Sequence, residues 1–97
     1  MGHLVLEYAL VRDYVERRAP LRGEHLALAR QANEAGDLLL AGALSEPVDR
    51  ALFVWSTDDR SVVERFAASD PYVREGLVTS WTVRAWTVVV GAGAAPV

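Results

Sequence analysis

Two residues of this chain, His25 and Asp70, are of types that transfer or hold protons in enzyme sites. His25 lies between Leu21 and Leu28 in a spacing that places it on the apolar face of a helix. Imidazole titrates near neutral pH, so a histidine at a pocket edge can act as a general acid or base. The alternative is a core histidine with one hydrogen-bond partner, and position alone favours that alternative.

Asp70 precedes Pro71 in the segment AASDPYVREGLV, and this residue also has two interpretations. Proline fits the first turn of a helix, and an aspartate before it can cap that turn. A carboxylate beside an imidazole orients the ring and stabilises its charged form. Capping is sufficient to explain Asp70, and a catalytic role requires that His25 lie within reach.

Three further polar residues are candidates for contacts to a substrate. Arg22, three residues before His25, could bind an anion or simply be solvated. Tyr72 could line a pocket, although packing is the more common role, and Ser45 could be a turn residue or a polar pocket group. The sequence lacks zinc-ligand spacing, a phosphate loop and a Ser-His-Asp signature. We therefore expect no metal and no cofactor.

The elements that must position these residues follow from the hydrophobic pattern. Period-two and continuous apolar runs predict strands, and apolar residues at helical spacing predict helices. Gly36 is a natural stop for the helix that carries His25, and Ser56–Asp59 fits a capping box for a later helix. In that helix from Leu21, Arg30 should point away from the apolar face. The expected strands are 4–10, 37–44, 50–56 and 77–90, with main helices from 21 to 35 and from the capping box through 67.

This order is β-α-β-β-α-β, the split βαβ or ferredoxin-like α+β arrangement. It predicts a four-stranded antiparallel sheet with two main helices on one face. The strands at 37–44 and 50–56 are apolar on both faces, so the face without helices should also be covered. A homodimer formed through the sheet faces would cover it. Trp55, Trp81 and Trp86 are candidates for the core or for this interface.

The length and composition limit the class of protein. A chain of 97 residues with 52% hydrophobic residues predicts one domain, 1–97, with a core at about 3–90 and a flexible tail at 91–97. The ten basic residues, all arginine, are scattered among thirteen acidic ones, which argues against nucleic-acid binding. The apolar runs are too short to cross a membrane. With no cysteine and no signal-peptide pattern, a cytoplasmic location is expected.

Three segments together resemble one family, the YCII-related (YciI-like) proteins. They are RGEHLALARQANEAGDLLLAGAL, DPYVREGLV and WTVRAW, in this order and spacing, and the resemblance covers nearly the whole chain. It implies a dimeric ferredoxin-like fold and an active site made by a helix histidine and the aspartate of an Asp-Pro motif. These correspond to His25 and Asp70. One branch of the family is similar to enzymes that remove chloride from a chlorinated hydroxyhydroquinone, and no feature ties this chain to that branch.

The residues and the resemblance together predict a small cofactor-free enzyme. His25 would act as general acid or base, with Asp70 orienting it, on an unknown small molecule, cyclic or aromatic in type. Elimination, isomerisation or hydrolysis would suit this pair, so a lyase-like (dehydrochlorinase-like) or hydrolase-like activity is expected. The first alternative is a non-catalytic dimeric module that binds a metabolite or regulates a partner. The second is a buried polar pair that only fixes the helices.

Overall fold

The computed structural model describes residues 2–91 and residue 94, so most of the expected tail at 91–97 lies outside the described residues. The described chain forms four strands and two long helices, with three short helical turns between them. In chain order these elements are β1 His3–Leu10, α1 Tyr14–Arg17, η1 Ala19–Leu21, α2 Arg22–Glu34, β2 Leu38–Ala43, β3 Arg50–Trp55, α3 Arg60–Ser69, α4 Pro71–Arg74 and β4 Val78–Trp86.

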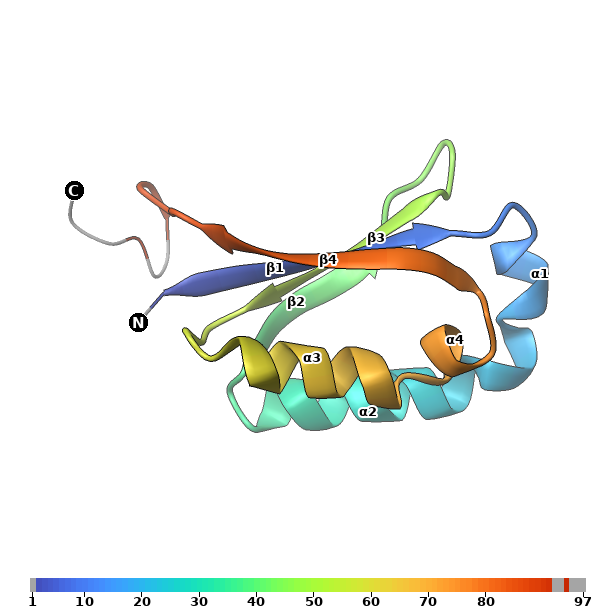
Figure 1. The fold of residues 1–97 in the computed structure, drawn as a ribbon, viewed down its shortest axis with the longest axis horizontal. Helices are drawn as coiled ribbons and strands as arrows, with labels where there is room; N and C mark the ends of the chain where they lie inside the picture. The colour runs from blue at the N-terminus through green and yellow to red at the C-terminus, as the bar shows by residue number, and fades with distance from the viewer. Residues whose placement is uncertain (1, 92–93, 95–97) are drawn as a thin grey trace.

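The strands form one antiparallel sheet in the order β2-β3-β1-β4. Both long helices, α2 and α3, lie on the same side of this sheet (Figure 1). The two central strands, β1 and β3, are neighbours, and β2 and β4 form the edges. This is the ferredoxin-like α+β arrangement, so the fold class predicted from the sequence is confirmed.

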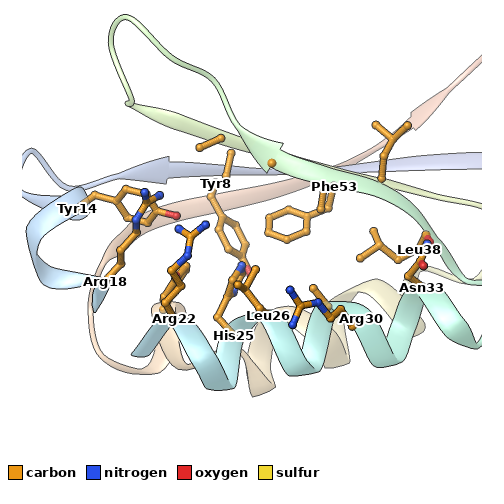
Figure 2. A pocket seen from close by; sticks show the side chains of 17 residues that line it. Tyr8, Tyr14, Arg18, Arg22, His25, Leu26, Arg30, Asn33, Leu38 and Phe53 are labelled. Atoms are coloured by element: carbon orange, nitrogen blue, oxygen red, sulfur yellow. The ribbon is translucent and has the colours of Figure 1, made fainter. Parts of the chain in front are cut away.

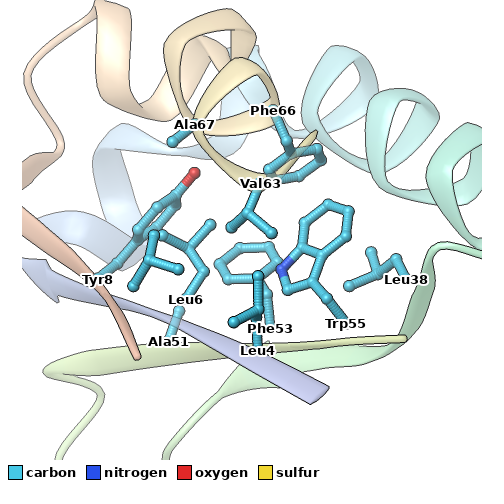
Figure 3. Packing of buried hydrophobic residues seen from close by; sticks show 11 residues of the cluster. Leu4, Leu6, Tyr8, Leu38, Ala51, Phe53, Trp55, Val63, Phe66 and Ala67 are labelled. Atoms are coloured by element: carbon cyan, nitrogen blue, oxygen red, sulfur yellow. The ribbon is translucent and has the colours of Figure 1, made fainter. Parts of the chain in front are cut away.

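Alternation along the strands separates the two faces of the sheet. Leu6 of β1 pairs with Phe53 and Val83, and all three side chains are buried. Side chains one position away, such as Val5 and Val54, point to the opposite face. The buried side chains pack between the sheet and the helices (Figure 3). This core consists of Leu4, Leu6, Tyr8, Leu38, Ala51, Phe53, Trp55, Val63, Phe66, Ala67 and Val83.

One helix end lies where the sequence predicted it, and one helix start does not. Gly36, with φ of 87°, follows the end of α2 as predicted, because this left-handed conformation has no steric penalty for glycine. The capping box expected at Ser56 is wrong. Asp59 is the residue that caps α3, and its carboxylate accepts a hydrogen bond from the backbone N–H of Ser61 at 2.9 Å.

No described helix lies on the second face of the sheet (Figure 1). The three tryptophans differ in position: Trp55 is fully buried in the core, Trp81 packs half-buried against it, and Trp86 is 51% exposed at the end of β4. In the described part of the chain, no helix has the length and apolar character that crossing a membrane requires. β4 ends at Trp86, four residues before the end that the sequence predicted.

Candidate functional site

Asp70 lies at the junction between α3 and α4, where the backbone is extended, with φ of −69° and ψ of 124°. Its Oδ1 accepts a hydrogen bond from the backbone N–H of Tyr72 at 3.0 Å and so caps α4, in which Pro71 is the first residue. The side chain is fully buried. The capping role that the Asp-Pro pair suggested is therefore present, and the same carboxylate has oxygen lone pairs for other donors.

His25 reaches this carboxylate from the first turn of α2. Its Nδ1 lies 2.9 Å from Oδ1 of Asp70, and the whole residue His25 is 9% exposed. An ionised carboxylate offers only acceptors, so in the neutral imidazole the hydrogen of this bond resides on Nδ1 and Nε2 keeps a lone pair. The structure thus brings together the two residues that the sequence singled out, across 45 positions of the chain.

A third residue, Tyr8 of β1, completes the surroundings of the carboxylate. Its hydroxyl donates a hydrogen bond of 2.7 Å to Oδ2 of Asp70. Burial and the neighbouring Asp70 charge raise the pKa of Tyr8 far above its usual value, so the phenol stays a donor. Tyr8 was not among the site residues predicted from the sequence. The available signal was its place beside Leu4 and Leu6 on the buried face of β1, where a phenol requires a polar partner.

The ring of Tyr72 stacks on the imidazole of His25, with centroids 3.9 Å apart and planes inclined by 12°. Burial raises the pKa of Tyr72 to about 12, with a smaller contribution from Tyr14, while Arg22 and Arg18 act in the opposite direction. The imidazole is therefore fixed by a hydrogen bond at its edge and by a ring against its face. This restricts the direction in which Nε2 can point.

The imidazole borders a cavity of about 330 Å³ between α2 and the β2 side of the sheet (Figure 2). Small residues of β2 leave space opposite the helix, and aromatic rings form much of the remaining wall. Because β2 is an edge strand, the cavity lies at the margin of the sheet. The lining consists of Tyr8, Tyr14, Arg18, Arg22, His25, Leu26, Ala29, Arg30, Asn33, Leu38, Leu40, Ala41, Gly42, Ala43, Ala51, Phe53 and Tyr72.

The other candidate residues divide between the cavity and the surface. Arg22 and Tyr72 line the cavity, whereas Ser45 lies in the exposed connection between β2 and β3 and is not part of the lining. Arg30 was predicted to point away from the apolar face, yet it lines the cavity, and Arg18 lines it as well. Arg30 was missed as a site residue because a helix in contact with both a core and a cavity has a wider inward surface than one apolar stripe. Arg18 was missed because it lies outside this helix, at the junction of α1 and η1.

The chemistry available to this arrangement is proton transfer at Nε2 of His25. Among the residues that the structure describes, no three His, Asp or Glu side chains gather as they would around a metal ion. The Asp70 carboxylate is bound to three donors and fully buried, so it can orient the imidazole and compensate a positive charge on it.

Comparisons with known proteins give a family and a fold. The family described as the YCII-related domain matches residues 1–87. A search of curated proteins found no match. Among solved structures, the chain is similar to 5-chloro-2-hydroxyhydroquinone dehydrochlorinase from Burkholderia phenoliruptrix, in a complex with 2,5-dihydroxybenzoquinone. That likeness has a TM-score of 0.74 at 14% identity, and it covers 89% of this chain and 94% of the other.

Two further solved structures have the same fold at similarly low identity. One is an antibiotic biosynthesis monooxygenase, with a TM-score of 0.59, 14% identity, and coverage of 93% of this chain and 100% of the other. The second is an uncharacterized NIPSNAP domain protein from Burkholderia xenovorans, with a TM-score of 0.57, 18% identity, and coverage of 99% of each chain. At these identities the likeness concerns the fold alone.

Replacing Tyr8 by phenylalanine should lower the stability of the protein. The change leaves Oδ2 of the buried Asp70 without its donor, and a buried polar group without a partner costs about 1–3 kcal/mol. Tyr14→Phe is the matched control, because it removes a hydroxyl from another buried tyrosine of the same cavity wall that forms no hydrogen bond with a described residue. Chemical denaturation at one protomer concentration measures both, and equal losses would contradict the role assigned to Tyr8.

Proposed function

Because the chain belongs to the YCII-related family, we propose that it is a small cofactor-free enzyme with a His25–Asp70 general acid/base pair. The observation that carries the proposal is the 2.9 Å contact between Nδ1 of His25 and the buried Asp70 carboxylate, at the wall of a cavity. A general acid or base must be held in position and must also be reachable by a substrate. His25 satisfies the first condition through Asp70 and the second through its place in the cavity lining.

Each residue around the imidazole has a separate task in this proposal. Nε2 of His25 takes a proton from the substrate or returns one to it. Asp70 fixes the tautomer and compensates the positive charge that forms on the ring. Tyr8 and the backbone N–H of Tyr72 hold the carboxylate, so it faces the imidazole in a constant orientation. Such positioned proton transfer contributes about 10²–10⁴-fold to a rate.

The proposed substrate is a small ring compound, and the reaction is an elimination, isomerisation or hydrolysis. The cavity volume of about 330 Å³ is near the lower end of the usual range for small-molecule sites, about 300–1,000 Å³. Its aromatic walls favour a flat ligand. The structurally similar dehydrochlorinase was solved with a dihydroxybenzoquinone, a ring of this size. Arg22 and Tyr72 are proposed as substrate contacts, and Ser45 could reach a substrate only if the β2–β3 connection moved toward the cavity.

A second candidate function is binding without turnover. The three hydrogen bonds to Asp70 fix α2 and α4 against β1, and this would also make the wall of a binding site rigid. In that case the imidazole would donate or accept a hydrogen bond to a metabolite and no covalent bond would change. The two functions differ in whether a bound compound exchanges protons or is converted.

Replacement of His25 by glutamine separates these functions. Small ring compounds that raise the melting temperature identify binders, and each binder is then followed in D₂O for product formation and deuterium uptake at carbon. His25→Gln should lower that rate about 10²–10⁴-fold while changing affinity much less.

The other histidine, His3, provides the control for this measurement. It lies in β1 outside the cavity lining, so His3→Gln should leave the rate unchanged. A His25→Gln protein that converts or exchanges the compounds at the wild-type rate would refute the acid/base assignment. Binding by the wild-type protein without any conversion or exchange would favour the binding module.

We further propose a homodimer through the sheet face that carries no helix. Apolar side chains on that face include Val5, Leu52 and Val54, all half-buried in the single chain. Exposed Leu40 and Trp86 belong to the two edge strands and extend the apolar surface. A second copy of the chain would remove this surface from water. The cytoplasmic location expected from the sequence stays a prediction.

An arginine at the centre of this face should prevent the dimer. Val54→Arg places a charge in the middle of the proposed interface, and burying an unpaired charge there is costly. Val15→Arg is the matched control, since Val15 is an exposed valine of α1 away from the sheet face. Sedimentation velocity should show a dimer for the wild type and Val15→Arg and a monomer for Val54→Arg. A monomeric wild type, or a dimeric Val54→Arg, would contradict the proposal.

A further inference from the structure

The charges that line the cavity are all of one sign. Arg18, Arg22 and Arg30 belong to the lining, and no aspartate or glutamate does. The chain as a whole has thirteen acidic and ten basic residues, so a shortage of acids does not explain this. Within the described ranges, the three arginines have no carboxylate at ion-pair distance, whereas Arg17, Arg50 and Arg74 each have one. The cavity wall therefore carries three guanidinium groups without an ion-pair partner among the described residues, Arg18 half-buried and Arg22 and Arg30 exposed to solvent. The buried carboxylate beside this wall, Asp70, is bound to Tyr8 and His25 instead.

The three guanidinium groups approach the imidazole from two ends. Arg22 precedes His25 by almost one helical turn, and Arg30 follows it by more than one turn, so they flank it along α2 (Figure 2). Arg18 joins Arg22 at the first end, where its guanidinium lies 5.2 Å from the centre of the Tyr14 ring. Figure 2 shows Arg18 and Arg22 on the same side of His25, and both lower the pKa of Tyr72.

The walls next to these arginines are rings. Tyr8 and Phe53 lie with centroids 4.7 Å apart, and Phe53 also meets the edge of His25 at 6.1 Å. These rings and Tyr72 give a rigid, mostly apolar surface between the two charged ends. A ligand that suits this site has a flat apolar body and an anionic group at one end.

The geometry points to a single-ring organic carboxylate as the ligand of this cavity, with its carboxylate bound by Arg18 and Arg22 and its ring beside His25. This inference rests on the proposed function only in using the same cavity, and it would hold for a binding module too. The guanidinium fork matches the two oxygens of a carboxylate, and two neighbouring forks can bind one such group. Arg30, at the other end, would meet a second oxygen substituent of the ring.

Carboxylate is favoured over phosphate by the composition of the lining. Phosphate sites commonly add backbone N–H groups of a glycine-rich loop, together with lysine or hydroxyl side chains. The cavity lining contains no serine or threonine, and the sequence has no phosphate loop. The polar contacts that the lining offers at this end are guanidinium and phenol groups.

Isothermal titration with four defined compounds at constant ionic strength tests this inference. Benzoate should bind, while benzamide, its neutral isostere, and acetate, its carboxylate without the ring, should each bind at least about tenfold more weakly. Phenyl phosphate should bind no more tightly than benzoate. Absence of benzoate binding at millimolar concentration, equal binding of benzamide, or tenfold tighter binding of phenyl phosphate would each overturn the assignment.

Variants of the arginines locate the carboxylate. Arg18→Gln and Arg22→Gln should each weaken benzoate binding about 10- to 100-fold, because a charge-assisted bond is lost. Arg22→Lys should bind between the wild type and Arg22→Gln, since it keeps the charge and loses the fork. Arg65→Gln removes the same charge from the exposed surface of α3 and should change nothing. An equal loss with Arg65→Gln would overturn the site.

His25→Gln keeps this test independent of the proposed catalysis. It should still bind benzoate with an affinity that depends on Arg18 and Arg22, even though proton transfer is lost. If no compound is converted or exchanged by the wild type while the arginine dependence holds, the acid/base function fails and the ligand class stands. If the arginines prove irrelevant while exchange depends on His25, the ligand class fails and the function stands.

Discussion

The candidate site depends on one buried carboxylate. Removing a carboxylate from water costs several kcal/mol unless hydrogen bonds replace the lost hydration. Asp70 receives these bonds from Tyr8 of β1, His25 of α2 and the backbone of Tyr72 in α4. Three elements far apart in the chain must therefore be in place together for this group to be buried. The same requirement leaves the imidazole in one orientation.

Two features of the neighbouring elements place this fixed pair beside a cavity. Helix α2 has two inward-facing stripes, one that packs on the core, with Leu28 and Ala32, and one that lines the cavity, with Arg22, Leu26 and Asn33. The centres of these two stripes are about 120° apart around the helix axis. His25 lies between the two stripes, so one edge of its ring meets Asp70 and the ring borders open space. Opposite the helix, β2 carries Ala41 and Ala43 on the face that the helices cover, where larger side chains would fill the cavity.

The sequence predicted the order of elements well because each long segment has a clear hydrophobic period, as at Leu4–Leu10 and around His25. The pairing of His25 with Asp70 came from the family resemblance and from the order of the helices, since spacing alone does not give a distance. Tyr8 was not predicted because the sequence pattern of a tyrosine in an apolar strand does not show whether its hydroxyl contacts water or a carboxylate. Arg18 and Arg30 were not predicted because the sequence does not show which arginines border a cavity and which have a carboxylate partner.

The tautomer of His25 in its neutral form tests the central claim most directly. Asp70 offers only acceptors, so the account requires the hydrogen on Nδ1 and a free lone pair on Nε2. Two-bond ¹H–¹⁵N correlation spectra of the imidazole distinguish the two neutral tautomers. The account predicts the Nδ1–H pattern for His25 and the loss of its predominance in Asp70→Asn, where the side-chain amide can also donate. A wild-type protein with the Nε2–H pattern would contradict it, because the nitrogen assigned to proton transfer would already be protonated.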